Sequence, residues 1–145
     1  MFKFAISIFF VLFSTCSLAS AASYDFQITG GLVKTSGGFT GGGIGDFVPS
    51  GTFTATFTDT TVIFSNISVA SVPSDFLAVL FFDGINRGGN LSGDTGPYTN
   101  RRGRATYSGS FDGNRLSLVG QYQAPCCDQI NFQYNLTAQV SWNWP

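Results

Sequence analysis

Apolar and polar residues alternate along most of the chain after residue 22, with the period of two that is typical of β-strands buried on one face. The alternation is clearest near the end of the chain, where every second residue from Ile130 to Trp142 is apolar. No segment repeats apolar residues at the 3.6-residue period of an amphipathic helix. The alternating segments are the predicted strands: residues 24–29, 52–58, 62–72, 104–111, 114–123 and 130–142.

One apolar segment does not alternate. Every residue from Phe76 to Phe82 is apolar, as in a strand that is covered on both faces. A helix also fits so short an apolar run, but its aromatic residues and the Asp83-Gly84 pair directly after it favour a strand. Residues 76–82 are therefore predicted to form a buried strand.

Glycine divides the predicted strands. Residues 30–51 contain half of the eighteen glycines, which costs too much backbone entropy for a long regular element. We predict a flexible loop there, with one short strand at residues 32–34. Residues 83–103 are rich in glycine and asparagine and predict a second, polar loop. Asp112-Gly113, between two alternating segments, predicts a tight hairpin turn.

These elements predict an all-β fold of about seven to eight strands, arranged as an antiparallel β-sandwich or a flattened barrel. Of the 145 residues, the 123 that follow residue 22 are enough for one domain and too few for two. Residues 23–145 are therefore predicted to form a single domain.

The first 22 residues differ in composition from the rest. Lys3 is the only charged residue before Asp25, and an apolar run over residues 4–13 follows it. Small residues come next, with an A-x-A sequence at residues 19–21. This order predicts a cleaved secretory signal peptide over residues 1–22. The apolar run is shorter than the roughly 20 residues of a transmembrane helix. We therefore expect a secreted, extracellular protein (periplasmic or at the cell surface in a bacterium) with no transmembrane helix.

Charge and composition narrow the possible functions. After residue 22 the chain carries six Lys and Arg residues against eight Asp, so a strongly basic nucleic-acid-binding face is not expected. The chain has no histidine and no glutamate. Without histidine, the Ser-His-Asp and Cys-His types of catalysis and the usual zinc sites are excluded. We predict no catalytic residue, no metal site and no cofactor.

Two kinds of residue are candidates for binding. Four arginines, Arg87, Arg101, Arg102 and Arg104, lie in or beside the polar loop, and such a cluster can bind an anion or an acidic polysaccharide. A solvated loop that keeps the protein soluble is the simpler interpretation. Trp144, at the end of the chain, is the aromatic residue best placed to stack on a sugar ring.

Cys126 and Cys127 are the only cysteines left once the predicted signal peptide is removed. A disulfide between neighbours is strained, because a trans peptide holds the two Cα atoms closer than ordinary bridges prefer. The alternatives are disulfides to a second chain, which would make an oligomer, and two free thiols. The pattern leaves all three open.

Three functions are compatible with these features. The first, which we predict, is a non-enzymatic extracellular binding or structural surface module, associated with carbohydrate or matrix, whose partner is a glycan or another extracellular protein. The second is a small outer-membrane β-barrel, although the predicted strands are unevenly spaced and the chain ends in Pro145. The third is an Asp-dependent hydrolase, which the missing Glu and His disfavour.

Overall fold

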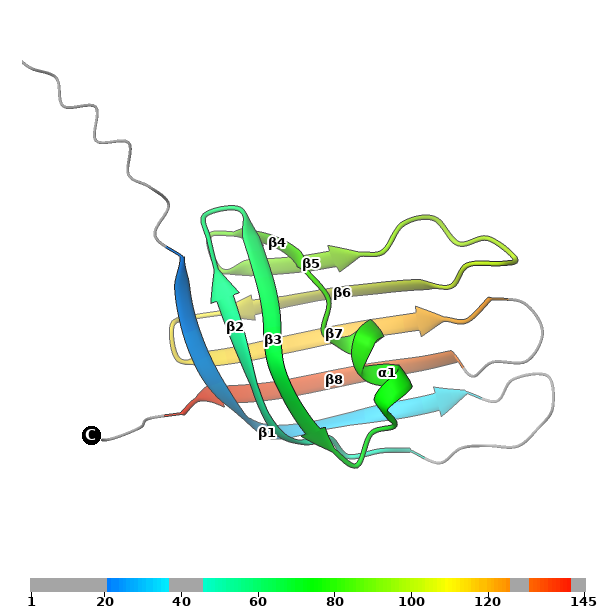
Figure 1. Ribbon diagram of the computed structural model, residues 1–145, viewed down its shortest axis with the longest axis horizontal. Helices are drawn as coiled ribbons and strands as arrows, with labels where there is room; N and C mark the ends of the chain where they lie inside the picture. Colours follow the sequence, from blue (N-terminus) through cyan, green and yellow to red (C-terminus); the bar gives the residue numbers. More distant parts are fainter. Residues whose placement is uncertain (1–20, 37–45, 126–130, 142–145) are drawn as a thin grey trace, which may run out of the picture.

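The computed structural model describes residues 21–36, 46–125 and 131–141 (Figure 1). Cys126, Cys127, Trp144 and residues 1–20 of the predicted signal peptide lie outside the described residues.

Eight antiparallel strands form a closed barrel, in which each strand pairs with its neighbours in sequence and the last pairs with the first. They are β1 (Ala22–Ser36), β2 (Ser50–Phe57), β3 (Thr61–Ala70), β4 (Gly84–Arg87), β5 (Asn90–Asp94), β6 (Arg104–Phe111), β7 (Arg115–Gln123) and β8 (Asn131–Val140). The closure is shortest between β3 and β4, which pair at two positions, Thr61 with Ile85 and Val62 with Gly84. The predicted antiparallel all-β fold is confirmed, and of the two predicted architectures the barrel is the one observed.

The two ends of the barrel differ. Short connections at residues 58–60, 88–89 and 112–114 lie at one end, here called the hairpin end, where Ser141 also lies (Figure 1). The longer connections between strands lie at the other end, here called the loop end. Asp112 forms the predicted tight turn before β7, and its carboxylate accepts hydrogen bonds from the N–H groups of Asn114 and Arg115.

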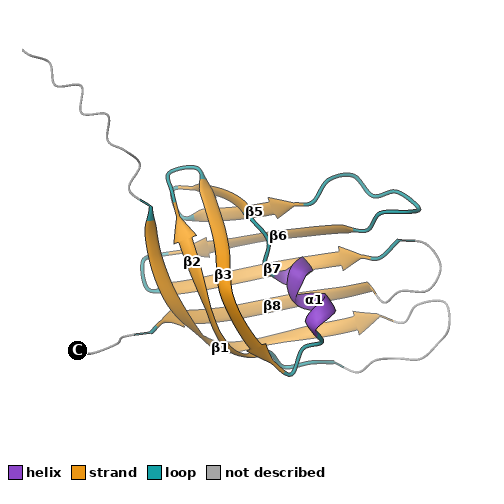
Figure 2. Ribbon diagram, viewed as in Figure 1, coloured by secondary structure: helices purple, strands orange, loops and turns teal. Residues whose placement is uncertain are grey.

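The prediction of a buried strand over residues 76–82 is wrong. This segment begins as the helix α1 (Ser74–Leu80), which lies at the loop end of the barrel (Figure 2). Leu80 and Phe81 are buried in the common core, and the Phe76 ring packs on that of Phe132 in β8, with 4.9 Å between centroids. A short helix that packs into a barrel mouth is apolar on most of its surface, as is a strand covered on both faces.

Two predicted loops contain regular strands. β1 continues through Gly30 and Gly31 to Ser36, where a loop was predicted to begin at residue 30. β1 pairs with β2 at residues 22–27 and with β8 at residues 26–36, and a bulge between Ile28 and Gly30 shifts the register with β8. Such bulges bend a strand where a sheet closes. Within the predicted polar loop 83–103, β4 and β5 form a short hairpin.

The barrel interior is filled with aromatic and aliphatic side chains. Phe26 and Phe53 are almost fully buried and stack with 5.2 Å between ring centroids. Tyr107 and Tyr134 also point inward, and their hydroxyls donate hydrogen bonds to the carbonyls of Phe82 and Leu80. The two tyrosines therefore join the barrel wall to the segment around the end of α1.

Each of these tyrosines lies against a glycine on the neighbouring strand. Tyr107 faces its direct partner Gly93, and Tyr134 faces its direct partner Gly120. A Cβ atom at either glycine would collide with the ring. The absence of a side chain at these glycines leaves the space in which an aromatic ring can lie along the wall.

Alkaline pH is expected to destabilise the barrel, because burial raises the pKa of Tyr107 and Tyr134 well above the ordinary value. Above about pH 10 the unfolded chain releases both protons while the folded chain keeps them. The free energy of unfolding should then fall by about 1.4 kcal/mol per pH unit for each tyrosine. Urea denaturation between about pH 8 and pH 11 measures this slope. The double variant Tyr107→Phe/Tyr134→Phe should lose it, and an unchanged slope in that variant would contradict the assignment.

Candidate functional site

The outer surface over β1, β2 and β3 consists of polar side chains that bond one another. The Ser23 and Thr56 hydroxyls are 2.7 Å apart, and the Thr54 hydroxyl donates to Asp25 Oδ1 at 2.8 Å. Asn66 Nδ2 donates in turn to Thr54 Oγ1 at 3.3 Å. Because these groups already have partners, this face offers few polar groups to a ligand.

The outer surface over the other half of the barrel is organised differently. The strand register places exposed or half-exposed residues in two rows that run across the strands, each residue directly opposite the next. The first, here called the polar row, consists of Lys34, Gln133, Gln121, Thr106 and Asp94 on β1, β8, β7, β6 and β5. The second, here called the mixed row, consists of Leu32, Asn135, Val119, Ser108, Ser92 and Ile85, and reaches β4.

A hollow runs along these two rows. Over β1, β8, β7 and β6 it has a volume of about 610 Å³ and is lined by both rows. A second depression of about 570 Å³, over β4 and β5, shares Thr106 with the first. A third, of about 490 Å³, shares Lys34, Gln121 and Gln133 and extends toward the loop end. We call the strip between the polar row and the mixed row, from β1 to β4, the transverse groove.

The polar side chains in the middle of the transverse groove are available for binding. Gln121, Gln133 and Asn135 are exposed, and their amides make no hydrogen bond with other described residues. The ammonium group of Lys34 likewise forms no ion pair with any described residue. An amide can both donate and accept, which matches a hydroxyl group. Val119, which is 60% exposed, adds an aliphatic surface between them.

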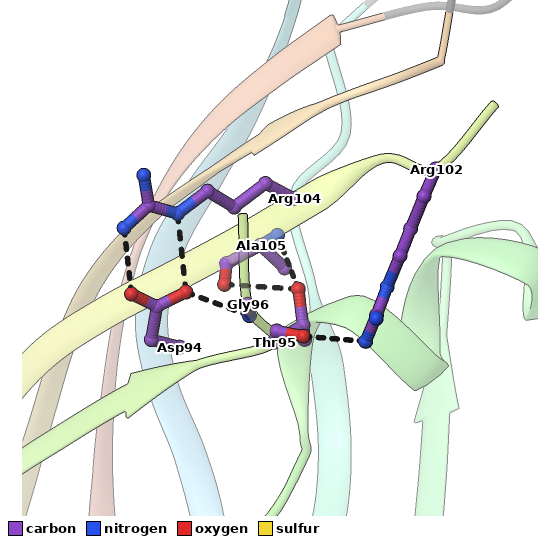
Figure 3. A network of polar contacts seen from close by, with 6 residues as sticks. All are labelled: Asp94, Thr95, Gly96, Arg102, Arg104 and Ala105. Carbon is purple, nitrogen blue, oxygen red and sulfur yellow. Dashed lines mark hydrogen bonds and ion pairs between the residues drawn. The ribbon is translucent and has the colours of Figure 1, made fainter. Parts of the chain in front are cut away.

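One end of the polar row carries a carboxylate that already has its partners (Figure 3). Arg104 donates from Nε and Nη2 to the two oxygens of Asp94, at 3.1 and 2.6 Å, and the N–H of Gly96 donates to Asp94 Oδ1 at 2.9 Å. The hydrogen bonds from Arg104, and to a smaller extent the one from Gly96, lower the pKa of Asp94 to about 2. The guanidinium therefore balances the charge at this end of the groove.

The predicted arginine cluster is divided by the fold. Arg101, Arg102 and Arg104 lie together at the loop end, in or beside the β5–β6 connection, whereas Arg87 ends β4 at the hairpin end. Arg104 is paired with Asp94, and Arg102 Nη2 donates to the carbonyl of Thr95 at 2.6 Å (Figure 3). The four arginines thus do not form one patch.

The groove residues Lys34, Gln121, Gln133, Asn135 and Val119 were not predicted as a site. Alternation places each of them on the outer face of its strand, but alternation does not show which outer residues meet. The pairing register supplies that information. No pattern in the separate segments contains it.

The described part of the chain contains no group of three or more Cys, Asp, Glu or His side chains that could hold a metal ion. Among the same residues, no helix is long and apolar enough to span a membrane.

The fold and the site define a small, closed, antiparallel barrel with an apolar interior and a polar outer groove. Comparisons of the chain with protein-family models, with curated proteins and with solved structures found no significant match.

Proposed function

We propose that the chain is a secreted, non-enzymatic binding module that holds a glycan in the transverse groove. The observation that carries this proposal is a set of three amides, Gln121, Gln133 and Asn135, that line one continuous hollow and make no hydrogen bond with other described residues. Sugar hydroxyls both donate and accept hydrogen bonds, as these amides do. The predicted signal peptide supports an extracellular location for such a module.

The distribution of polarity supports a barrel that faces water. The described interior holds no buried polar or charged residue apart from the two inward tyrosine hydroxyls, and the outer rows are largely polar. A barrel of the outer membrane has an apolar band outside and a polar interior. The alternative of an outer-membrane barrel is disfavoured on this ground.

The lowered pKa of Asp94 favours a binding role for this carboxylate over a role as a catalytic acid. Asp83 and Asp94 line the same depression. Cleavage of a glycoside by two carboxyl groups needs one with a raised pKa that donates a proton. Asp94 has instead a pKa lowered to about 2 by Arg104, which suits a permanent hydrogen-bond acceptor.

A glycan array with the purified secreted protein tests the proposal. The double variant Gln121→Ala/Gln133→Ala is expected to bind its glycan about tenfold more weakly or worse, because each lost hydrogen bond contributes about 0.5–1.5 kcal/mol. Gln139→Ala is the matched control, since Gln139 is exposed on the same strand as Gln133 but lies outside the groove. Absence of binding to every glycan, or an equal loss in the control, would contradict the proposal.

A further inference from the structure

We infer that the ligand is an extended, uncharged polysaccharide that lies across the strands and is recognised through an internal segment of its chain. This inference rests on the proposed glycan-binding function and names the kind of glycan. Three features of the transverse groove carry it: its length, the chemistry of its two walls and its charge.

The groove is long. It crosses six strands from β1 to β4 by way of β8, β7, β6 and β5. At the usual spacing of neighbouring strands, this path is about 24 Å long. A site built for the end of a chain would be a closed pocket. A strip that continues over the surface suits a stretch of polymer instead.

The two walls of the groove differ in a regular way. Every residue of the polar row can form hydrogen bonds through its side chain. The mixed row contains three aliphatic and three polar residues, and its exposed aliphatic members are Val119 and Ile85 at 60% and 46%. A pyranose ring presents hydroxyls at its edge and C–H groups on its face. A chain of such rings can place hydroxyls against the polar row and C–H surface against the aliphatic side chains.

Charge within the groove is nearly balanced. Lys34 stands at one end of the polar row, and Asp83 and Asp94 line the depression at the other. Asp94 is already paired with Arg104 at 2.6 Å. The mixed row contains no charged residue, and the residues between the two ends of the polar row are uncharged. A negatively charged polysaccharide would meet one unpaired cationic side chain along this path, that of Lys34. An uncharged polysaccharide therefore matches the groove better.

An extended peptide is the other polymer of suitable shape, but the fold gives it less to bind. Peptides that add to a sheet do so through the free backbone groups of an edge strand. β6, β7 and β8, in the middle of the groove, pair with a neighbour on both sides, so a peptide lying on them would have to bind through side chains alone.

Calorimetry with oligosaccharides of graded length tests the inference. The probes are cello-, xylo- and manno-oligosaccharides of one to six units, and oligogalacturonates of the same lengths. For at least one neutral series, affinity should rise at least tenfold from the monosaccharide to the hexamer and should not change with salt. Equal affinity for monomer and hexamer, or tighter and salt-dependent binding of the oligogalacturonates, overturns the inference and leaves the glycan-binding function standing.

Two valines provide a matched pair of variants. Val119 and Val48 are 60% and 62% exposed, but only Val119 lies in the groove. Val119→Lys should abolish the gain in affinity with length, while Val48→Lys should leave it unchanged, and circular dichroism should show both variants folded. No binding of any glycan by the unmodified protein overturns both proposals, as does Val119-dependent binding of an extended Ser/Thr-rich peptide in place of a glycan.

Discussion

Gly120→Ala is expected to destabilise the barrel by about 3 kcal/mol, the upper part of the usual range for overpacking a close-packed site. A Cβ atom at this position would lie 2.5 Å from Cε1 of Tyr134 and 2.6 Å from the carbonyl oxygen of Thr106. Both separations are below the 3.0 Å that real Cβ atoms keep. The carbonyl belongs to the backbone of β6 and cannot turn away. The new methyl group must therefore push the Tyr134 ring from the wall.

Displacement of that ring also breaks a hydrogen bond. The Tyr134 hydroxyl donates to the carbonyl of Leu80 at 3.3 Å, so the end of α1 loses one of its attachments when the ring moves. Urea denaturation measures the cost. In a Tyr134→Leu background, which removes the ring, Gly120→Ala should lower the free energy of unfolding by clearly less, because the effects of substitutions at residues in contact are not additive. The same cost in both backgrounds would show that the ring is not the obstacle.

The alternation of apolar and polar residues was sufficient to predict most of the strands. β8 illustrates the reason, because a barrel with a dry interior buries one face of each strand along its length. The segment 76–82 shows the limit of the same rule. A helix packed into the barrel mouth and a strand covered on both faces are both apolar throughout, so the pattern does not distinguish them.

Glycine content was a poor guide to where β1 ends. Gly31 has φ +146°, and a Cβ atom there would lie 2.5 Å from the carbonyl oxygen of Asn135. This glycine allows β8 to approach closely beside the bulge in β1. Glycine is needed both in flexible loops and where two backbones come close, and composition alone does not separate the two cases.

The candidate site depends on pairings that no local pattern contains. Alternation along β7 and β8 is consistent with outward-facing Gln121 and Gln133, but only the register of β7 against β8 makes them neighbours. Lys34 joins them because the barrel closes β1 on β8, from opposite ends of the chain. The sequence shows which side chains can form hydrogen bonds. It does not show that these side chains form a groove, because the groove is created by the closure of the barrel and the register of its strands.

Phe53→Ala is the core substitution with the largest expected effect. Phe53 is 1% exposed and stacks on Phe26, and its ring centroid lies 4.9 Å from that of Phe81, directly after α1. It therefore connects the barrel wall with the helical segment. Removing a buried phenyl ring costs about 3–5 kcal/mol through lost burial and the cavity left behind. Domains of this size have a total stability of about 5–15 kcal/mol, so the variant should lose a large share of its stability, which urea denaturation measures.

Phe111→Ala is the matched control for this prediction. Phe111 is half-buried between β6 and β7, and stacks on Phe57 with 4.4 Å between ring centroids. Its removal should cost less, because less surface returns to water and solvent can fill the space. Phe53→Ala should in addition speed hydrogen exchange at the Phe81 amide, which donates to the carbonyl of Leu77, whereas Phe111→Ala should not. If the two variants lost equal stability, the interior around Phe53 would not be the centre of the fold.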